Sequence, residues 1–167
     1  MSALAIVEFA PELAGEFEAI NAEWIEAMFT LEPTDRAVLS DPVNHVIAPG
    51  GVILFVRHDT LGIIGTCALK PSVNGTWELT KMGVRASARG QKAGQVLLHA
   101  MLDRAAALPI DLLYLLTSSR CNAAIHLYEK AGWMHDAAIL SRFGASYQRC
   151  DVAMSFDLAS RRTTNAL

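Results

Sequence analysis

The sequence lacks the features that most directly reveal a compartment. It has three cysteines, Cys67, Cys121 and Cys150, an odd number with no CxxC pairing, which gives no sign of a disulfide framework and fits a reducing cytoplasm. No apolar run approaches the length of a membrane span, and no charged segment followed by an apolar one opens the chain. We therefore expect a soluble, cytoplasmic protein without a membrane partner.

Several common ligand motifs are also missing. Neither GxxxxGK[ST] nor GxGxxG occurs, which argues against a P-loop and a dinucleotide fingerprint. The five histidines show no ligand spacing, so we expect no metal site. Aromatic and basic residues do not interleave and the net charge is -3, so we expect no nucleic-acid partner.

The length and composition of the chain predict a compact domain. With 167 residues, 52% of them hydrophobic and 19% charged, the chain predicts one domain over residues 1–160 and a frayed tail over 161–167. Charge is uneven, because residues 1–41 hold nine acids and one base. In one interpretation the acidic region is a solvated helix face. In the other, it attracts a cationic substrate while the basic remainder of the chain holds an anionic cofactor.

Hydrophobic periodicity predicts alternating strands and helices. We expect helices at 11–31, 34–40, 90–108 and 122–131, the last capped by Gly132. We expect strands at 3–9, an antiparallel meander over 52–84, a buried strand at 110–116, a short strand at 133–135 and a last strand at 149–158. Residues 42–51 are predicted to form a loop, and 136–147 an irregular segment.

The stretch 76–94 combines a strand, a glycine-containing loop and the start of an amphipathic helix. Such a loop leaves backbone N–H groups unpaired at a helix N-terminus, where the helix dipole is positive. Arg85, Arg89 and Lys92 add positive charge to the same loop. The stretch therefore suits a phosphate or pyrophosphate group.

The motifs in this order resemble the GNAT superfamily of N-acetyltransferases, in a bacterial subgroup of unassigned acceptor. The family loop [Q/R]-x-x-G-x-[G/A] matches Arg89 to Gly94, five residues after Val84, except that Lys92 stands at the glycine position. The later signature N-x-x-A-x-x-x-Y-E-K-x-G-F is matched by Asn122, Ala124 or Ile125, Tyr128, Glu129, Lys130, Gly132 and Trp133.

The resemblance implies an α/β (α+β) fold with a mixed, mostly antiparallel sheet of six or seven strands, about four flanking helices and splayed central parallel strands. It implies acetyl-CoA as cofactor, with the pantetheine along Lys81 to Val84 and near Asn122. The implied cofactor-binding residues are Met82, Val84, Arg89, Gly90, Gln91, Lys92, Ala93, Gly94, Gln95, Asn122 and Tyr128.

The resemblance also implies direct attack of an amine on the thioester, which requires a base, an oxyanion donor and an acid. Glu78 is the candidate base, six residues before Val84 and expected on the same strand face, with Trp77 and Leu79 beside it raising its pKa. It could instead pair with a basic side chain. Tyr128 is the candidate acid, or a helix tyrosine bonded to a carbonyl, and the Met82 N–H is the candidate oxyanion donor.

The expected acceptor is a primary amine, on a small molecule or a peptide. We expect residues 11–31, 32–50 and 136–148 to wall its site, with an acidic bias that favours a cation. Two alternatives stay open: a non-catalytic acyl-CoA-binding module, and transfer of a longer acyl group or to oxygen. A homodimer is possible through the last strand and an apolar surface.

Overall fold

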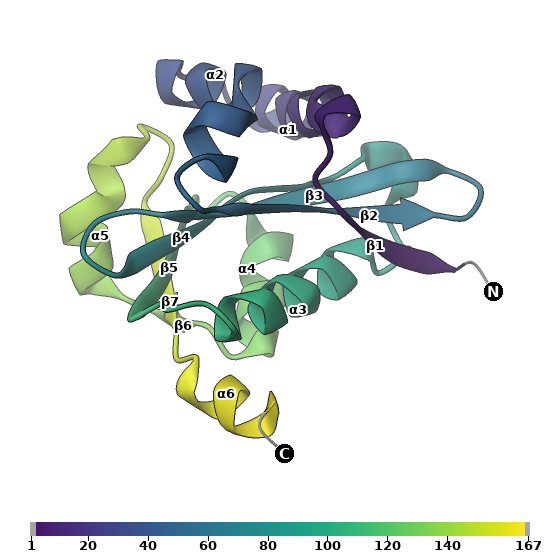
Figure 1. Ribbon diagram of the computed structural model, residues 1–167. Coiled ribbons are helices and arrows are strands. Elements are labelled where there is room, and N and C mark those ends of the chain that lie inside the picture. Colours follow the sequence, from purple (N-terminus) through teal and green to yellow (C-terminus); the bar gives the residue numbers. More distant parts are fainter. Residues whose placement is uncertain (1–2, 166–167) are drawn as a thin grey trace.

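The computed structural model describes residues 3–165 and contains one seven-stranded sheet in the order β1-β2-β3-β4-β5-β7-β6. The strands are β1 Leu4–Glu8, β2 Val52–His58, β3 Gly62–Pro71, β4 Thr76–Val84, β5 Leu112–Thr117, β6 Met134–His135 and β7 Val152–Phe156. The α-helices are α1 Ala14–Met28, α2 Pro33–Ser40, α3 Ala93–Ala106, α4 Asn122–Ala131, α5 Ala137–Phe143 and α6 Ala159–Asn165. In Figure 1, α1 and α2 cover one face of the sheet, and α3 and α4 the other.

The predicted fold class is confirmed. All neighbouring strands pair antiparallel except β4 and β5, which are parallel and joined through α3. A parallel pair needs such a crossover connection, whereas the antiparallel strands β2 to β4 are joined by short turns. The Asn74-Gly75 turn before β4 has positive φ at both residues, as this dipeptide predicts.

Two hydrophobic cores hold the helices on the sheet. On one face, Phe17 and Ile25 of α1 pack with Val38 of α2 and Phe55 of β2. On the other face, the apolar stripe of α3 packs with side chains of β3, β4 and β5. Because both faces are covered, β5 reads in sequence as a nearly continuous apolar run.

The two parallel strands separate part-way along their length. β4 pairs with β5 only over Thr76 to Leu79, opposite Leu112 to Leu115. Beyond this point β5 continues beside β7, while β4 stays paired with β3. The β5-facing edge of residues 80–84 is therefore free, which is the splay that the family resemblance implied.

A bulge in β4 lies at the same place. Ala68 of β3 pairs with Thr80 and Thr66 pairs with Gly83, so Lys81 and Met82 together stand opposite Cys67. Lys81 has a φ of 53°, in the left-handed region that a lysine seldom adopts. One extra residue in one strand of a pair reverses the inside and outside alternation that follows it.

Three local predictions were wrong. The segment 136–147 is mostly helical: the Asp136 side chain accepts a hydrogen bond from the Ile139 N–H at 3.1 Å and starts α5. Residues 43–47 form a π-helical turn within the expected loop. The tail is helical over 161–165, because Arg162 donates to the carbonyls of Ala106, Leu108 and Ile110 and anchors it; residues 166 and 167 lie outside the described chain.

Within residues 3–165, none of the helices combines the length and the apolar character that a membrane crossing requires.

Candidate active site

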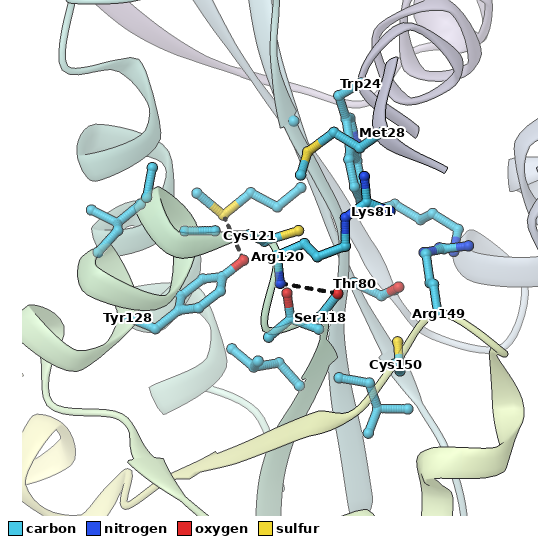
Figure 2. Close-up of a pocket in the computed structure, with 18 of the residues that line it drawn as sticks. Trp24, Met28, Thr80, Lys81, Ser118, Arg120, Cys121, Tyr128, Arg149 and Cys150 are labelled. Carbon is cyan, nitrogen blue, oxygen red and sulfur yellow. Dashed lines mark hydrogen bonds between the residues drawn. The ribbon is translucent and has the colours of Figure 1, made fainter. Parts of the chain in front are cut away.

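A cleft of about 540 Å³ opens where β4 and β5 separate. Its walls come from the end of α1, the free edge of β4, the end of β5, the start of α4 and the segment before β7. Figure 2 shows Tyr128 on one side of the cleft, with Lys81 and Arg149 on the other. Of the predicted site residues, six line it: Met82, Val84, Arg89, Gly94, Asn122 and Tyr128.

One end of the cleft is the loop before α3, which was predicted to hold a pyrophosphate. Gly90 has a φ of 88°, and Gln91 and Lys92 are exposed. Ala93, Gly94 and Gln95 form the first turn of α3, so their N–H groups have no partner within the helix. The loop therefore offers unpaired donors at the positive end of the helix.

Lys92 adopts the backbone conformation that a glycine would take at its position. It is the N-cap of α3, with φ 62° and ψ 21°. This is the left-handed region, which costs a residue with a side chain roughly 1 to 2 kcal/mol. The chain therefore keeps the loop geometry with a lysine, and places an exposed ammonium group there.

Gly94 allows a close approach between helix and strand. A Cβ there would lie 3.3 Å from Leu127 Cδ2 and 3.6 Å from Met82 Cε. A larger side chain would push α3 away from α4 and β4. The glycine thus brings the unpaired N–H groups of α3 to the rim of the cleft.

Tyr128 and Asn122 both come from α4. Asn122 is the exposed first residue of this helix. The Tyr128 hydroxyl donates to Met82 Sδ at 3.8 Å, and its ring packs against Trp133. Burial raises the pKa of Tyr128 well above its usual value, so the hydroxyl keeps its proton throughout the physiological pH range.

Glu78 is not among the residues that line the cleft, whereas its neighbours Leu79 and Thr80 are. The side chain is partly buried, and burial raises the pKa of its carboxyl, while the charges of Lys81 and Lys70 act in the opposite direction. An interaction with the Thr80 side chain also acts to lower the Glu78 pKa, and Thr80 is itself part of the cleft lining. The Thr80 side chain acts in the same direction on the pKa of Tyr147.

Glu78 and Val84 do not share a strand face, contrary to the prediction. The bulge at Lys81 and Met82 lies between them and reverses the alternation. Glu78 pairs across from Lys70, and Val84 packs with the α3 side chain of Val96 on the other face. Glu78 therefore lies on the sheet face that α1 and α2 cover, rather than on the α3 face (Figure 1).

A buried ionic cluster at the opposite end was not anticipated. Lys81 Nζ lies 3.0 Å from Asp35 Oδ1 and donates to the Tyr147 hydroxyl at 2.9 Å. Both terminal nitrogens of Arg149 donate to Asp35, at 2.7 and 2.8 Å, and one also donates to Glu32 at 3.2 Å. Lys81, Tyr147 and Arg149 contribute to the cleft lining, whereas Asp35 is fully buried behind them.

The electrostatics of the cluster follow from burial and pairing. Burial disfavours the Asp35 carboxylate, but hydrogen bonds from Arg149 and the charge of Lys81 outweigh it and lower its pKa to about 2. Burial also lowers the pKa of Lys81 and raises that of Tyr147. For Arg149, the bonds to Asp35 outweigh burial and raise the pKa. Asp35 and Arg149 are therefore charged near neutral pH.

Comparisons with known proteins agree with this geometry. The sequence profile of the Acetyltransferase (GNAT) family matches residues 16–133, which is more than half of the chain. The chain belongs to the GNAT acetyltransferase family. Its cofactor is accordingly acetyl-CoA. No curated protein matches the sequence.

Solved GNAT structures share the fold. A GNAT acetyltransferase from Staphylococcus aureus Mu50 superposes with a TM-score of 0.82 at 21% identity, over 93% of this chain and 99% of that one. The yncA structure from Salmonella typhimurium, which contains acetyl-CoA as its cofactor, gives 0.69 at 15% identity, over 93% and 94%. An acetyltransferase from Streptococcus agalactiae gives 0.68 at 15% identity, over 92% and 96%.

Proposed function

We propose that this GNAT protein is an N-acetyltransferase that moves an acetyl group from acetyl-CoA directly to a primary amine. The observation that carries the proposal is the cleft at the β4 splay. There the free strand edge, the Tyr128 hydroxyl and the Thr80 hydroxyl in front of Glu78 converge on one space. A cofactor-binding module without chemistry has no need for this convergence.

The residues present suit the cofactor. Acetyl-CoA supplies a thioester, whose carbonyl carbon an amine can attack. The unpaired N–H groups around Gly90 to Gln95, with Arg89 and Lys92, would hold the pyrophosphate. The free edge of β4 up to Val84 would pair with the pantetheine amides, with Asn122 at the facing wall. The Met82 N–H, at the bulge, would donate to the developing negative charge on the carbonyl oxygen.

Glu78 is the base in this proposal, and it acts through Thr80. The amine proton passes to the Thr80 oxygen while the Thr80 proton passes to the Glu78 carboxylate, so that the net result is the transfer of one proton from the amine to Glu78. The raised pKa of Glu78 brings it nearer to the operating pH, where a general base is most effective. A path through one hydroxyl also explains how a residue outside the cleft lining could act on the acceptor.

Tyr128 is the acid. Its raised pKa keeps the hydroxyl protonated at the operating pH, so a hydrogen-bond and proton donor is present for the departing thiolate. Its hydroxyl already points at the sulfur of Met82, on the cleft wall. Loss of this proton donor should slow thiolate departure without changing how tightly the cofactor binds.

The acceptor would enter from the α1 side of the cleft, as a small-molecule or peptide amine. Trp24, Met28 and Phe29 line this side, and Tyr147 closes the other. The expected walls at 11–31 and 136–148 thus contribute directly, whereas 32–50 contributes Asp35 behind the lining.

All three cysteines are free thiols, which suits the proposed cytoplasmic location.

The test combines an amine panel with one variant. Release of the CoA thiol from acetyl-CoA should depend on an amine, and Tyr128→Phe should lower kcat about a hundredfold at unchanged acetyl-CoA affinity. Tyr114→Phe is the matched control, because Tyr114 is a buried β5 tyrosine outside the cleft lining. If the wild type binds acetyl-CoA and acetylates no amine, the protein is a binding module instead.

A further inference from the structure

We propose that the acceptor amine carries a carboxylate on an apolar body, and that Arg120 binds this carboxylate. The inference rests on the proposed function, because it names the acceptor of the same cleft. It reverses the expectation of a cationic acceptor that the acidic N-terminal quarter suggested.

The cleft lining contains cations and no acids. Its charged members are Lys81, Arg89, Arg120 and Arg149, and neither aspartate nor glutamate occurs among the lining residues. Three of the nine N-terminal acids are engaged elsewhere: Glu16 with Arg85, Glu8 with Arg104, and Glu23 with the Ala86 N–H. No acid of the N-terminal quarter is among the residues that line the cleft.

The buried cluster also presents its positive side to the cleft. Two cations, Lys81 and Arg149, balance two acids, Asp35 and Glu32. However, Asp35 is fully buried and neither acid lines the cleft, whereas both cations do. Because the Arg149 guanidinium lines the cleft while its carboxylate partners do not, this cluster contributes a positive potential to the cleft.

Arg120 is the cleft cation best placed to bind an acceptor anion. It is exposed, in the loop between β5 and α4, and its guanidinium lies 4.7 Å from the centre of the Phe29 ring across the cleft. Its side chain makes no ion pair with the described part of the chain. Stacking on an aromatic ring leaves the N–H fork at the guanidinium edge available, and that fork matches a carboxylate.

The same positive potential assists the chemistry. An amine attacks only in its uncharged form, and neighbouring cations disfavour its protonated form. Trp24, Met28 and Phe29 offer apolar surface to the body of the acceptor. Together these features select an amine that carries its own negative charge, such as an apolar amino acid, over a diamine or a lysine side chain.

The experiment compares acceptors that differ only in charge. Leucine, methionine and phenylalanine are each assayed beside their carboxamides. We expect the best amino acid to exceed its amide at least tenfold in kcat/KM. The α-amino group of the carboxamide is less basic than that of the amino acid, so more of it is uncharged near neutral pH. This difference favours the carboxamide as a nucleophile, so it works against the expected result.

Arg120→Gln should lower kcat/KM for the amino acids about tenfold and leave kcat/KM for the carboxamides unchanged. Arg57→Gln is the control, since Arg57 is an exposed arginine on β2, away from the cleft. Equal use of amino acids and amides by the wild type would overturn the proposal. So would a variant whose KM for acetyl-CoA rises with every acceptor, because Arg120 would then serve a cofactor phosphate.

A binding readout separates this inference from the proposed function. With CoA bound, 4-methylpentanoate should raise the melting temperature of the wild type but not of Arg120→Gln, and 4-methylpentanamide should raise neither. If no amine is acetylated but this pattern appears, the carboxylate site stands and amine transfer fails. If the acid and the amide stabilise equally, the carboxylate site is absent.

Discussion

The two ends of the cleft are built in opposite ways. The proposed cofactor end is an exposed loop with unpaired backbone N–H groups and two exposed cationic side chains, Arg89 and Lys92. The acceptor end is a buried network in which Asp35, Lys81, Tyr147 and Arg149 bond to one another through their side chains. In our proposal the loop binds the cofactor of the family, and the buried network borders the acceptor site.

The difference predicts how each end responds to mutation. Backbone donors survive most side-chain changes, so the cofactor end should lose affinity only gradually. A buried ionic network is costly to break, because removing one partner leaves the others charged and unpaired. Four substitutions test this contrast.

The largest effect should come from Asp35→Asn. It leaves Lys81 and Arg149 without their shared carboxylate, so we expect the free energy of unfolding to fall by about 3 to 5 kcal/mol in urea denaturation. The wild-type contribution should be complete above the ordinary aspartate pKa and disappear as the pH falls towards about 2. Asp41→Asn is the control, since Asp41 caps an exposed turn. A loss below about 1 kcal/mol for Asp35→Asn would contradict this view of the network.

Thr80→Val should have the next largest effect, on rate rather than stability. Valine keeps the shape but cannot relay a proton to Glu78, so kcat should fall about a hundredfold, or about 2.7 kcal/mol in the barrier. Thr80→Ser restores the hydroxyl and should recover most of the rate. The KM for acetyl-CoA should stay unchanged in both variants. If Thr80→Val keeps the wild-type rate, Glu78 is either reached by another path or is not the base.

Glu78→Gln should act on stability in a pH-dependent way. The folded-state pKa of Glu78 is raised, so stability in the wild type falls as the pH rises from the ordinary glutamate value through the raised one. Glutamine does not ionise, and the variant should therefore gain over the wild type with rising pH, by about 1.4 kcal/mol for each unit of pKa shift. Melting temperatures at acidic and at mildly alkaline pH measure this. A constant difference across that range would show that Glu78 is not perturbed by burial.

These contrasts also explain what the sequence could and could not predict. The proposed cofactor end is local: the loop 89–95 and the helix 122–131 each carry their pattern within a few residues, and Arg89, Gly94, Asn122 and Tyr128 from these segments line one cleft. The acceptor end joins Asp35, Lys81 and Arg149 across separations of 46 and 114 residues, and no single-sequence pattern encodes such contacts. The sequence does not predict the β4 bulge either, since the bulge depends on how β4 pairs with Cys67 of β3. Because of this bulge, Glu78 and Val84 do not share the strand face that was expected.

The smallest effect should come from Lys92→Gly, at the cofactor end. Glycine adopts the left-handed conformation at Lys92 without strain, but it also loses more entropy on folding, so stability should change by less than about 1 kcal/mol. The ammonium group is lost, and acetyl-CoA should bind a few-fold more weakly, with a shallower dependence on salt. Lys92→Asn separates the two effects, because asparagine tolerates this conformation but is uncharged. If both variants bind acetyl-CoA as tightly as the wild type, the backbone donors alone hold the pyrophosphate, and the contrast between the two ends becomes sharper still.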